Sequence, residues 1–154
     1  MKCFNDTLYT KITTATLQPV LNTLKLLKSS NVHLEITNLV IPGYTDDMTM
    51  ISEMCDWLIS NGFSETPLHF SRFFPAYKMQ NVPSTPVATV EKAVSIAKSK
   101  GIKYVYLGNV SDTTNTHCAN CGEELIKRDG YKVNILMKSG VCPKCSRTVP
   151  GIWE

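Results

Sequence analysis

The residues best suited to chemistry in this sequence are six cysteines, four of which form two pairs near the C-terminus. Each pair has the spacing Cys-x2-Cys, and twenty residues separate the two pairs. A Cys-x2-Cys pair places two thiolates on one tight turn, and two such turns facing each other complete a tetrahedral set of sulfur ligands. The sequence therefore predicts one bound metal ion. Its predicted ligands are Cys118, Cys121, Cys142 and Cys145.

Zinc is the expected ion, because closed four-thiolate sites are typical of structural zinc. Iron in a rubredoxin-like site is the alternative, since a Cys-Pro-Lys-Cys turn such as residues 142–145 also suits iron. Four protein ligands leave no open coordination position, so the predicted role is structural. Such a metal can contribute ~10 kcal/mol or more of folding free energy. His117 adjoins the first pair and could replace a ligand, but the four cysteines complete the set without it.

The two remaining cysteines have no partner at metal-binding spacing. We interpret Cys55 as a core residue, because it lies on the apolar face of a predicted helix, and Cys3 as the end of a strand. No apolar run approaches the ~18 residues needed to span a bilayer, and the first residues contain no apolar signal-peptide core. The expected location is therefore cytoplasmic. Thiols stay reduced there, so paired cysteines indicate metal or redox chemistry rather than disulfides.

The charge distribution argues against nucleic-acid binding. The net charge is +3, with ten basic and eight acidic side chains in residues 1–110 and six and five in residues 111–154. Neither part forms the basic block that would follow a phosphate backbone. The composition, 43% hydrophobic and 19% charged, is typical of a globular protein rather than a disordered one.

Upstream of the paired cysteines, the apolar pattern alternates between helical and strand periods. Helices are predicted over residues 16–29, 46–61 and 86–100, and strands over residues 33–41, 68–74 and 104–107. We expect Thr45 to cap the second helix, with Asp46 and Asp47 in its first turn, and Thr85 to cap the third, with Pro86 at its first position. Apolar strands joined by helices favour right-handed crossovers and a parallel sheet.

The chain therefore divides into a βα region, residues 1–110, and a cysteine ribbon, residues 111–154. The polar stretch 111–116 is the predicted linker, and residues 131–137 are the predicted strand between the two cysteine turns. The βα region has three strands, or four if residues 2–5 end another. Parallel sheets normally bury both faces and rarely leave edges exposed. We therefore expect this region to be part of a larger βα assembly. It would be completed by another chain or by self-association through the sheet edge, or it is a truncated piece of such an assembly.

Four segments, at residues 34–44, 69–75, 104–110 and 150–153, resemble in this order parts of radical SAM enzymes related to pyruvate formate-lyase activating enzyme. More narrowly, they resemble the radical SAM member of the AmmeMemoRadiSam system. Residues 34–44 (LEITNLVIPGY) resemble the fifth strand of that family, and residues 69–75 (HFSRFFP) the sixth. Residues 104–110 (YVYLGNV) precede the same kind of cysteine ribbon, and residues 150–153 (PGIW) resemble its ending. The resemblance implies an α/β fold: the C-terminal half of a partial βα barrel, with a short parallel sheet, plus a zinc-ribbon-like metal knuckle domain.

The sequence departs from that family at its catalytic cluster. The family holds a [4Fe–4S] cluster in a Cys-x3-Cys-x2-Cys loop, which this sequence does not contain; Cys3 is alone in the first fifty residues. We therefore expect no catalysis by this chain alone. S-adenosylmethionine and the cluster would bind only with a partner chain that supplies an N-terminal half-barrel carrying the loop. The alternative interpretation is a non-catalytic metal-binding module for protein interaction.

The resemblance also implies a set of cofactor contacts, because strand ends in this half of the barrel line the cofactor pocket. By position these are Thr37, Asn38, Ser71 and Arg72. An inward arginine could bind a carboxylate through paired hydrogen bonds. Two alternatives stay open: neighbouring backbone could satisfy the polar residues of the first strand, and Arg72 could pair with Glu35. We interpret His69 as a structural histidine.

Overall fold

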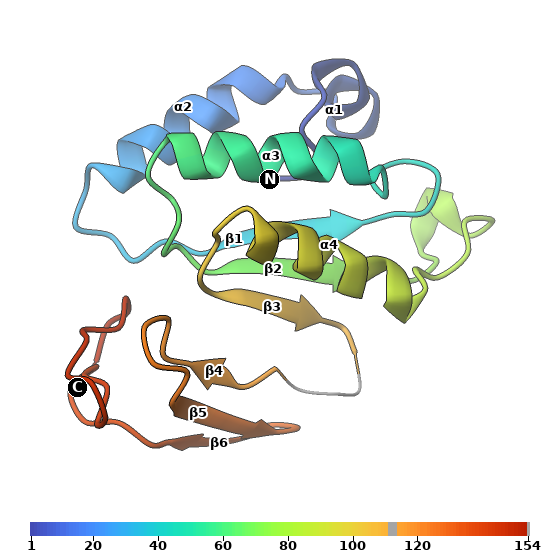
Figure 1. Cartoon of the computed structure of the whole chain (residues 1–154). Coiled ribbons are helices and arrows are strands. Elements are labelled where there is room, and N and C mark those ends of the chain that lie inside the picture. The colour runs from blue at the N-terminus through green and yellow to red at the C-terminus, as the bar shows by residue number, and fades with distance from the viewer. Residues whose placement is uncertain (111–113, 154) are drawn as a thin grey trace. The chain divides into compact units, whose positions relative to one another are not determined.

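The computed structural model describes residues 1–110 and 114–153 (Figure 1). The chain forms two compact units, Met1–Asn109 and Val110–Glu154, and each is described by itself. The predicted linker, 111–116, falls partly on residues 111–113, which lie outside the described residues. Within the described part of the chain, no helix is long and apolar enough to cross a membrane.

The first unit is a mixed α/β structure built on a parallel three-stranded sheet, as predicted. The strand order is β1-β2-β3, so β1 and β3 are the outer strands. A 3-10 turn, η1, follows β2. The elements are α1 (Asp6–Thr13), α2 (Leu17–Lys28), β1 (Ile36–Val40), α3 (Met48–Ser60), β2 (Leu68–Arg72), η1 (Tyr77–Met79), α4 (Val87–Ser99) and β3 (Val105–Gly108).

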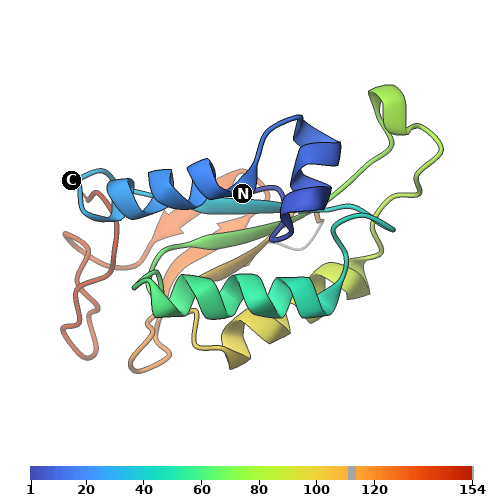
Figure 2. The same cartoon turned by 90° about the horizontal axis from the view of Figure 1, so that it is seen from above.

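The two faces of this sheet differ in character, because successive side chains of a strand point to opposite faces. Helices α3 and α4 lie on one face (Figures 1 and 2). That face carries the fully buried core, including Val40, Leu68 and Phe70. The opposite face carries Thr37, which is exposed, and the partly exposed His69 and Ser71. We call this second surface the open face of the sheet. Such a surface is unusual for parallel strands, which are normally covered on both sides.

The N-terminal segment differs from the prediction. Residues 2–5 are not a strand, and they lead into α1, which the sequence analysis missed. Asn5 caps this helix, because its side chain accepts a hydrogen bond from the Leu8 amide at 2.9 Å. The segment still lies beside β1, since the Met1 amino group donates to the Thr37 carbonyl at 2.9 Å. It therefore shields part of an edge that the prediction left open.

Two predicted helix caps are wrong. The buried Thr45 hydroxyl donates to the Leu39 carbonyl and accepts from the Ile41 amide, both at 2.7 Å. Asp47 is the actual cap of α3 and accepts from the Thr49 amide at 2.8 Å, while Asp46 lies outside the helix. The Thr45 hydroxyl thus satisfies backbone groups at the carboxyl end of β1, which would otherwise lack a hydrogen-bond partner.

Thr85 has a similar tertiary role instead of capping α4. Its buried hydroxyl donates to the Val40 carbonyl at 2.5 Å and accepts from the Phe73 amide at 2.9 Å. Val40 is the last residue of β1, and Phe73 directly follows β2. The Thr85 side chain therefore links the carboxyl ends of these two strands. Helix α4 begins at Val87 after Pro86, with no side-chain cap.

The second unit is a small antiparallel sheet. Its strands are β4 (Thr116–His117), β5 (Glu124–Asp129) and β6 (Lys132–Ile135), in the order β4-β5-β6. The single predicted strand over 131–137 is therefore only half of a hairpin that turns at Gly130, whose φ is +56°. The core of this unit includes Leu125, Ile126, Met137 and Val149.

Candidate metal centre

The two Cys-x2-Cys turns have the same backbone construction. In the first, the Gly122 amide donates to the Cys118 carbonyl at 2.9 Å, and in the second, the Ser146 amide donates to the Cys142 carbonyl at 3.0 Å. The residue after each pair has a positive φ, +75° at Gly122 and +59° at Ser146. This left-handed residue turns the chain back after each pair, so that both sulfurs of a pair lie on the same side of the turn.

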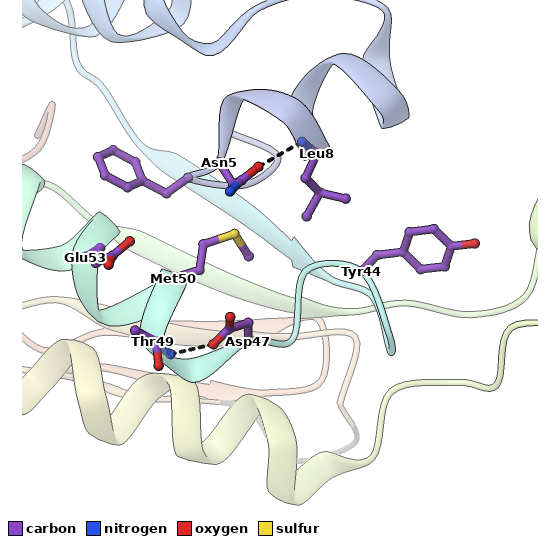
Figure 3. Close-up of a pocket in the computed structure, with 8 residues that line it drawn as sticks. Asn5, Leu8, Tyr44, Asp47, Thr49, Met50 and Glu53 are labelled. Carbon is purple, nitrogen blue, oxygen red and sulfur yellow. Dashed lines mark hydrogen bonds between the residues drawn. The ribbon is translucent and has the colours of Figure 1, made fainter.

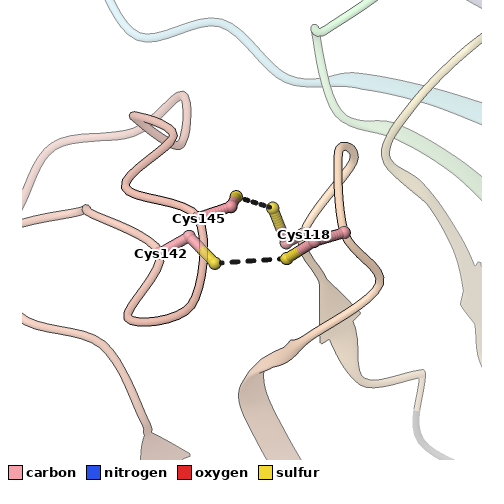
Figure 4. Close-up of side chains that lie close together, drawn as sticks. Cys118, Cys142 and Cys145 are labelled. Atoms are coloured by element: carbon pink, nitrogen blue, oxygen red, sulfur yellow. Dashed lines mark hydrogen bonds between the residues drawn. The ribbon is translucent and has the colours of Figure 1, made fainter.

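The structure brings all four predicted cysteines together (Figure 4). Their sulfur atoms lie within 4.8 Å of one another, with 3.5 Å between Cys118 and Cys145 and 3.6 Å between Cys121 and Cys142. A metal with four Zn–S bonds of about 2.3 Å requires sulfur separations of about 3.8 Å in a tetrahedron. The observed spacing therefore fits a single metal ion. A [4Fe–4S] cluster places each thiolate on a different iron and needs its sulfurs further apart.

Hydrogen bonds around the cluster distinguish its thiols. The Asn120 side chain and the Arg147 amide donate to Cys145 and lower the pKa of its thiol to about 6. Cys121 also receives a backbone hydrogen bond, from Glu123, but burial and the competing thiols raise its pKa to about 12. These contacts favour the thiolate form of Cys145 over that of Cys121. A divalent cation removes this competition, because it stabilises all four thiolates at once.

The other cysteines and the neighbouring histidine stand apart from this cluster. Cys55 is buried in α3, and burial together with Asp56 raises the pKa of its thiol to about 11. Cys3 is buried beside α1 and α2, and burial raises its pKa as well. His117 is exposed, and its Nε2 lies 3.9 Å from the carboxylate of Glu124. The interpretation of Cys55 as a core residue matches its position in the structure.

The four candidate cofactor contacts do not converge. Thr37 and Ser71 belong to the open face, whereas Asn38 is buried on the helix-covered face. The Asn38 amide donates to the Lys2 carbonyl at 3.0 Å and lies 3.8 Å from the sulfur of Met54 in α3. Neighbouring backbone thus satisfies its donor, as one of the open alternatives expected. Thr37 and Asn38 are consecutive, so the alternation of a strand excludes a shared pocket for both side chains.

Arg72 lies at the carboxyl end of β2. Its Nε donates to the Thr85 carbonyl at 2.6 Å, and its guanidinium lies 5.1 Å from the centre of the Phe74 ring. The alternative pairing with Glu35 does not occur, because the Glu35 carboxylate instead contacts His33 at 3.1 Å and His69 at 2.7 Å. Sequence patterns alone do not reveal this acid–histidine group, since its members come from two segments far apart in the chain.

A cavity of about 290 Å³ lies between the start of α1 and the start of α3 (Figure 3). Two of its polar side chains are helix caps, Asn5 and Asp47, whose side chains already accept hydrogen bonds from backbone amides. We assign no ligand to it for that reason. Its lining residues are Phe4, Asn5, Leu8, Tyr44, Asp47, Thr49, Met50 and Glu53.

The fold and the cysteine cluster together define an α/β protein with an appended four-cysteine metal-binding unit. No family model matches the chain. The chain is similar to Uncharacterized protein MJ0808 of Methanocaldococcus jannaschii, with 40% identity over 150 residues. The match covers 94% of this chain but 45% of the relative, so the chain spans less than half the length of the relative it matches.

Proposed function

We propose that the second unit holds one structural zinc ion at Cys118, Cys121, Cys142 and Cys145. The convergence of four sulfur atoms at tetrahedral spacing carries this proposal. The ion would link the two turns and stabilise a unit that has few core side chains of its own. It would leave no position for a substrate, so its role is structural.

Metal analysis of the anaerobically purified chain tests this proposal. About one zinc per chain without visible absorbance is the expected result. One iron per chain with a visible thiolate-to-iron band would assign the site to iron and overturn zinc. Several irons with inorganic sulfide would overturn the single-ion geometry itself.

We infer further that the first unit is the C-terminal half of a βα barrel of the radical SAM class, related to pyruvate formate-lyase activating enzyme. The open face supports this inference, since parallel sheets are normally covered on both faces, and this one presents Thr37 and Ser71 on its uncovered side. In a barrel that face would point inward. The greater length of the relative is consistent with an additional half, because the chain covers only 45% of it.

In this proposal the chain contributes binding groups rather than the reactive centre. A [4Fe–4S] cluster supplies the electron that cleaves S-adenosylmethionine in such enzymes, and here it would belong to the other half. Cys3 and Cys55 cannot hold it, because both are buried and belong to different packing regions. Ser71, on the open face near the carboxyl end of β2, would be placed to line the cofactor pocket, since barrel enzymes bind ligands at the carboxyl ends of their strands. Arg72 is in phase with Leu68 and Phe70 and its Nε is bound to the Thr85 carbonyl, so its side chain would have to turn to reach the cofactor.

The full-length M. jannaschii relative provides the direct test. After anaerobic reconstitution with iron and sulfide, it should bind a [4Fe–4S] cluster and convert S-adenosylmethionine to 5′-deoxyadenosine when reduced. Omitting the reductant is the matched control and should abolish product. A folded, zinc-bound relative that takes up no cluster would contradict the radical SAM assignment.

That negative result would favour a non-catalytic interaction module, and one observation supports this second candidate. All four residues of the edge strand β6 are exposed, including Val133 at 53% and Ile135 at 58%. Exposed apolar side chains on an unpaired edge strand are typical of surfaces that bind another chain.

A further inference from the structure

A second group of metal-ligating side chains lies in the first unit, remote in sequence from the cysteines. The Glu35 carboxylate accepts from the Nε2 atoms of two histidines, one on each oxygen: His33 at 3.1 Å and His69 at 2.7 Å. Partial burial raises the pKa of Glu35, but the hydrogen bonds from both histidines outweigh it and leave the pKa below its ordinary value. The carboxylate is therefore ionised at neutral pH, as a metal ligand must be.

The sheet itself brings these residues together. Glu35 directly precedes β1, and His69 is the second residue of β2, paired with Thr37 in the parallel register. Glu35 is in phase with Thr37, so its side chain points to the open face, where His69 also lies, and His33 reaches the Glu35 carboxylate from the segment before β1. The His69 ring is stacked on Tyr106 of β3, with ring centres 5.1 Å apart, which fixes the direction of its Nε2.

Each histidine nitrogen lies close enough to the Glu35 carboxylate to share an ion with it. Two ligands at about 2.1 Å from a metal and at right angles to each other lie about 3 Å apart, which matches both nitrogen–oxygen distances in this group. The two imidazoles now occupy opposite oxygens of the carboxylate and must move closer to share one ion. His33 can make this movement, because it lies in the irregular segment before β1.

We propose that His33, Glu35 and His69 form a second metal site, which takes a divalent transition-metal ion such as nickel or zinc. Imidazole nitrogen is the favoured donor for these ions, and water would complete the coordination. The side chains are accessible, with exposed fractions of 31% for His33, 47% for Glu35 and 29% for His69. A bound ion would join the segment before β1 to β2 at the amino end of the sheet. This proposal does not depend on the function proposed above.

Nickel titration of the chain loaded with one equivalent of zinc, which the four cysteines should hold, tests the site under anaerobic conditions. One additional Ni²⁺ should bind per chain, measured by calorimetry, and the variants His33→Gln, His69→Gln and Glu35→Gln should each weaken it by about tenfold or more. His117→Gln is the matched control, because His117 is the third histidine of the chain and lies in the other unit. It should leave the affinity for nickel unchanged.

A second measurement separates specific binding from loss of structure. Paramagnetic Ni²⁺ should broaden the imidazole signals of His33 and His69 in NMR spectra at equimolar metal, while those of His117 stay sharp. Each variant should retain its zinc content and its circular dichroism. Equal broadening of all three histidines, or equal affinity in the His69→Gln and His117→Gln variants, would overturn the proposal.

Discussion

Replacing Cys142 by serine should unfold the second unit while the first remains folded. Cys142 is a buried member of the four-cysteine cluster, and serine cannot supply a thiolate. The described apolar core of this unit includes four well-buried side chains, which contribute about 1.5–3 kcal/mol each. They are Leu125, Ile126, Met137 and Val149.

The magnitude follows from comparing that core with the metal. Four such side chains contribute about 6–12 kcal/mol. A structural zinc contributes about 10–16 kcal/mol at neutral pH. Because the net stability of an ordinary domain is only about 5–15 kcal/mol, loss of most of the metal contribution exceeds what the unit can sustain.

Amide NMR spectra of the isotopically labelled chain would measure the result. Signals from residues 114–153 should collapse into the narrow range of an unfolded chain, and those of residues 1–109 should stay dispersed. Lys144→Gln is the matched control, because Lys144 lies between the cysteines of the same turn but is exposed and is not a ligand. A Cys142→Ser variant with dispersed signals throughout the second unit would refute this reasoning.

Three further outcomes follow from the first unit. Gly108→Ala should lower the melting temperature, because its Cβ would clash with the Ser71 Oγ, and Ser71→Gly in the same chain should restore most of the loss. Cys55 should resist alkylation at pH 8, since a pKa of about 11 leaves about one thiolate in a thousand; mass spectrometry after metal removal should find rapid labelling at the cluster but not at Cys55. The lowered pKa of Glu35 means that its stabilising contribution is complete above the ordinary carboxyl value of 4.5 and is lost as pH falls through the lower, folded-state value. In the Glu35→Gln variant, the free energy of unfolding measured by denaturant titration should therefore fall less below pH 4.5 than in the unsubstituted chain. An equal fall in both proteins would contradict this prediction.

The strands and long helices of the first unit were predictable because each depends on a local pattern. The apolar run around Ile36 and Val40 predicted a strand over residues 33–41, which contains β1. The helical spacing of apolar residues predicted a helix over residues 16–29, and α2 ends within one residue of each of these bounds. Helix α1 was missed because its eight residues are too few for a helical pattern to stand out, and its stability depends on the Asn5 cap and on packing against α2.

The caps at Thr45 and Thr85 were mispredicted for a different reason. A threonine before an apolar helical pattern satisfies the local rule for a cap. In the folded chain, each hydroxyl is instead buried beside unpaired backbone groups at strand ends, such as the Val40 carbonyl and the Phe73 amide. Leaving such groups unpaired costs about 1–3 kcal/mol each, which outweighs the smaller gain from a helix cap.

By itself the sequence identified the four cysteines that the structure brings together, since the spacing of Cys118 and Cys121, repeated at Cys142 and Cys145, fixes two tight turns whose geometry is local. Tertiary structure alone decided which face of the sheet the helices cover, and so left Thr37 exposed and Asn38 buried. It also placed His69 against Glu35, 34 residues away. Contacts of that kind depend on the register between strands, which no local spacing encodes.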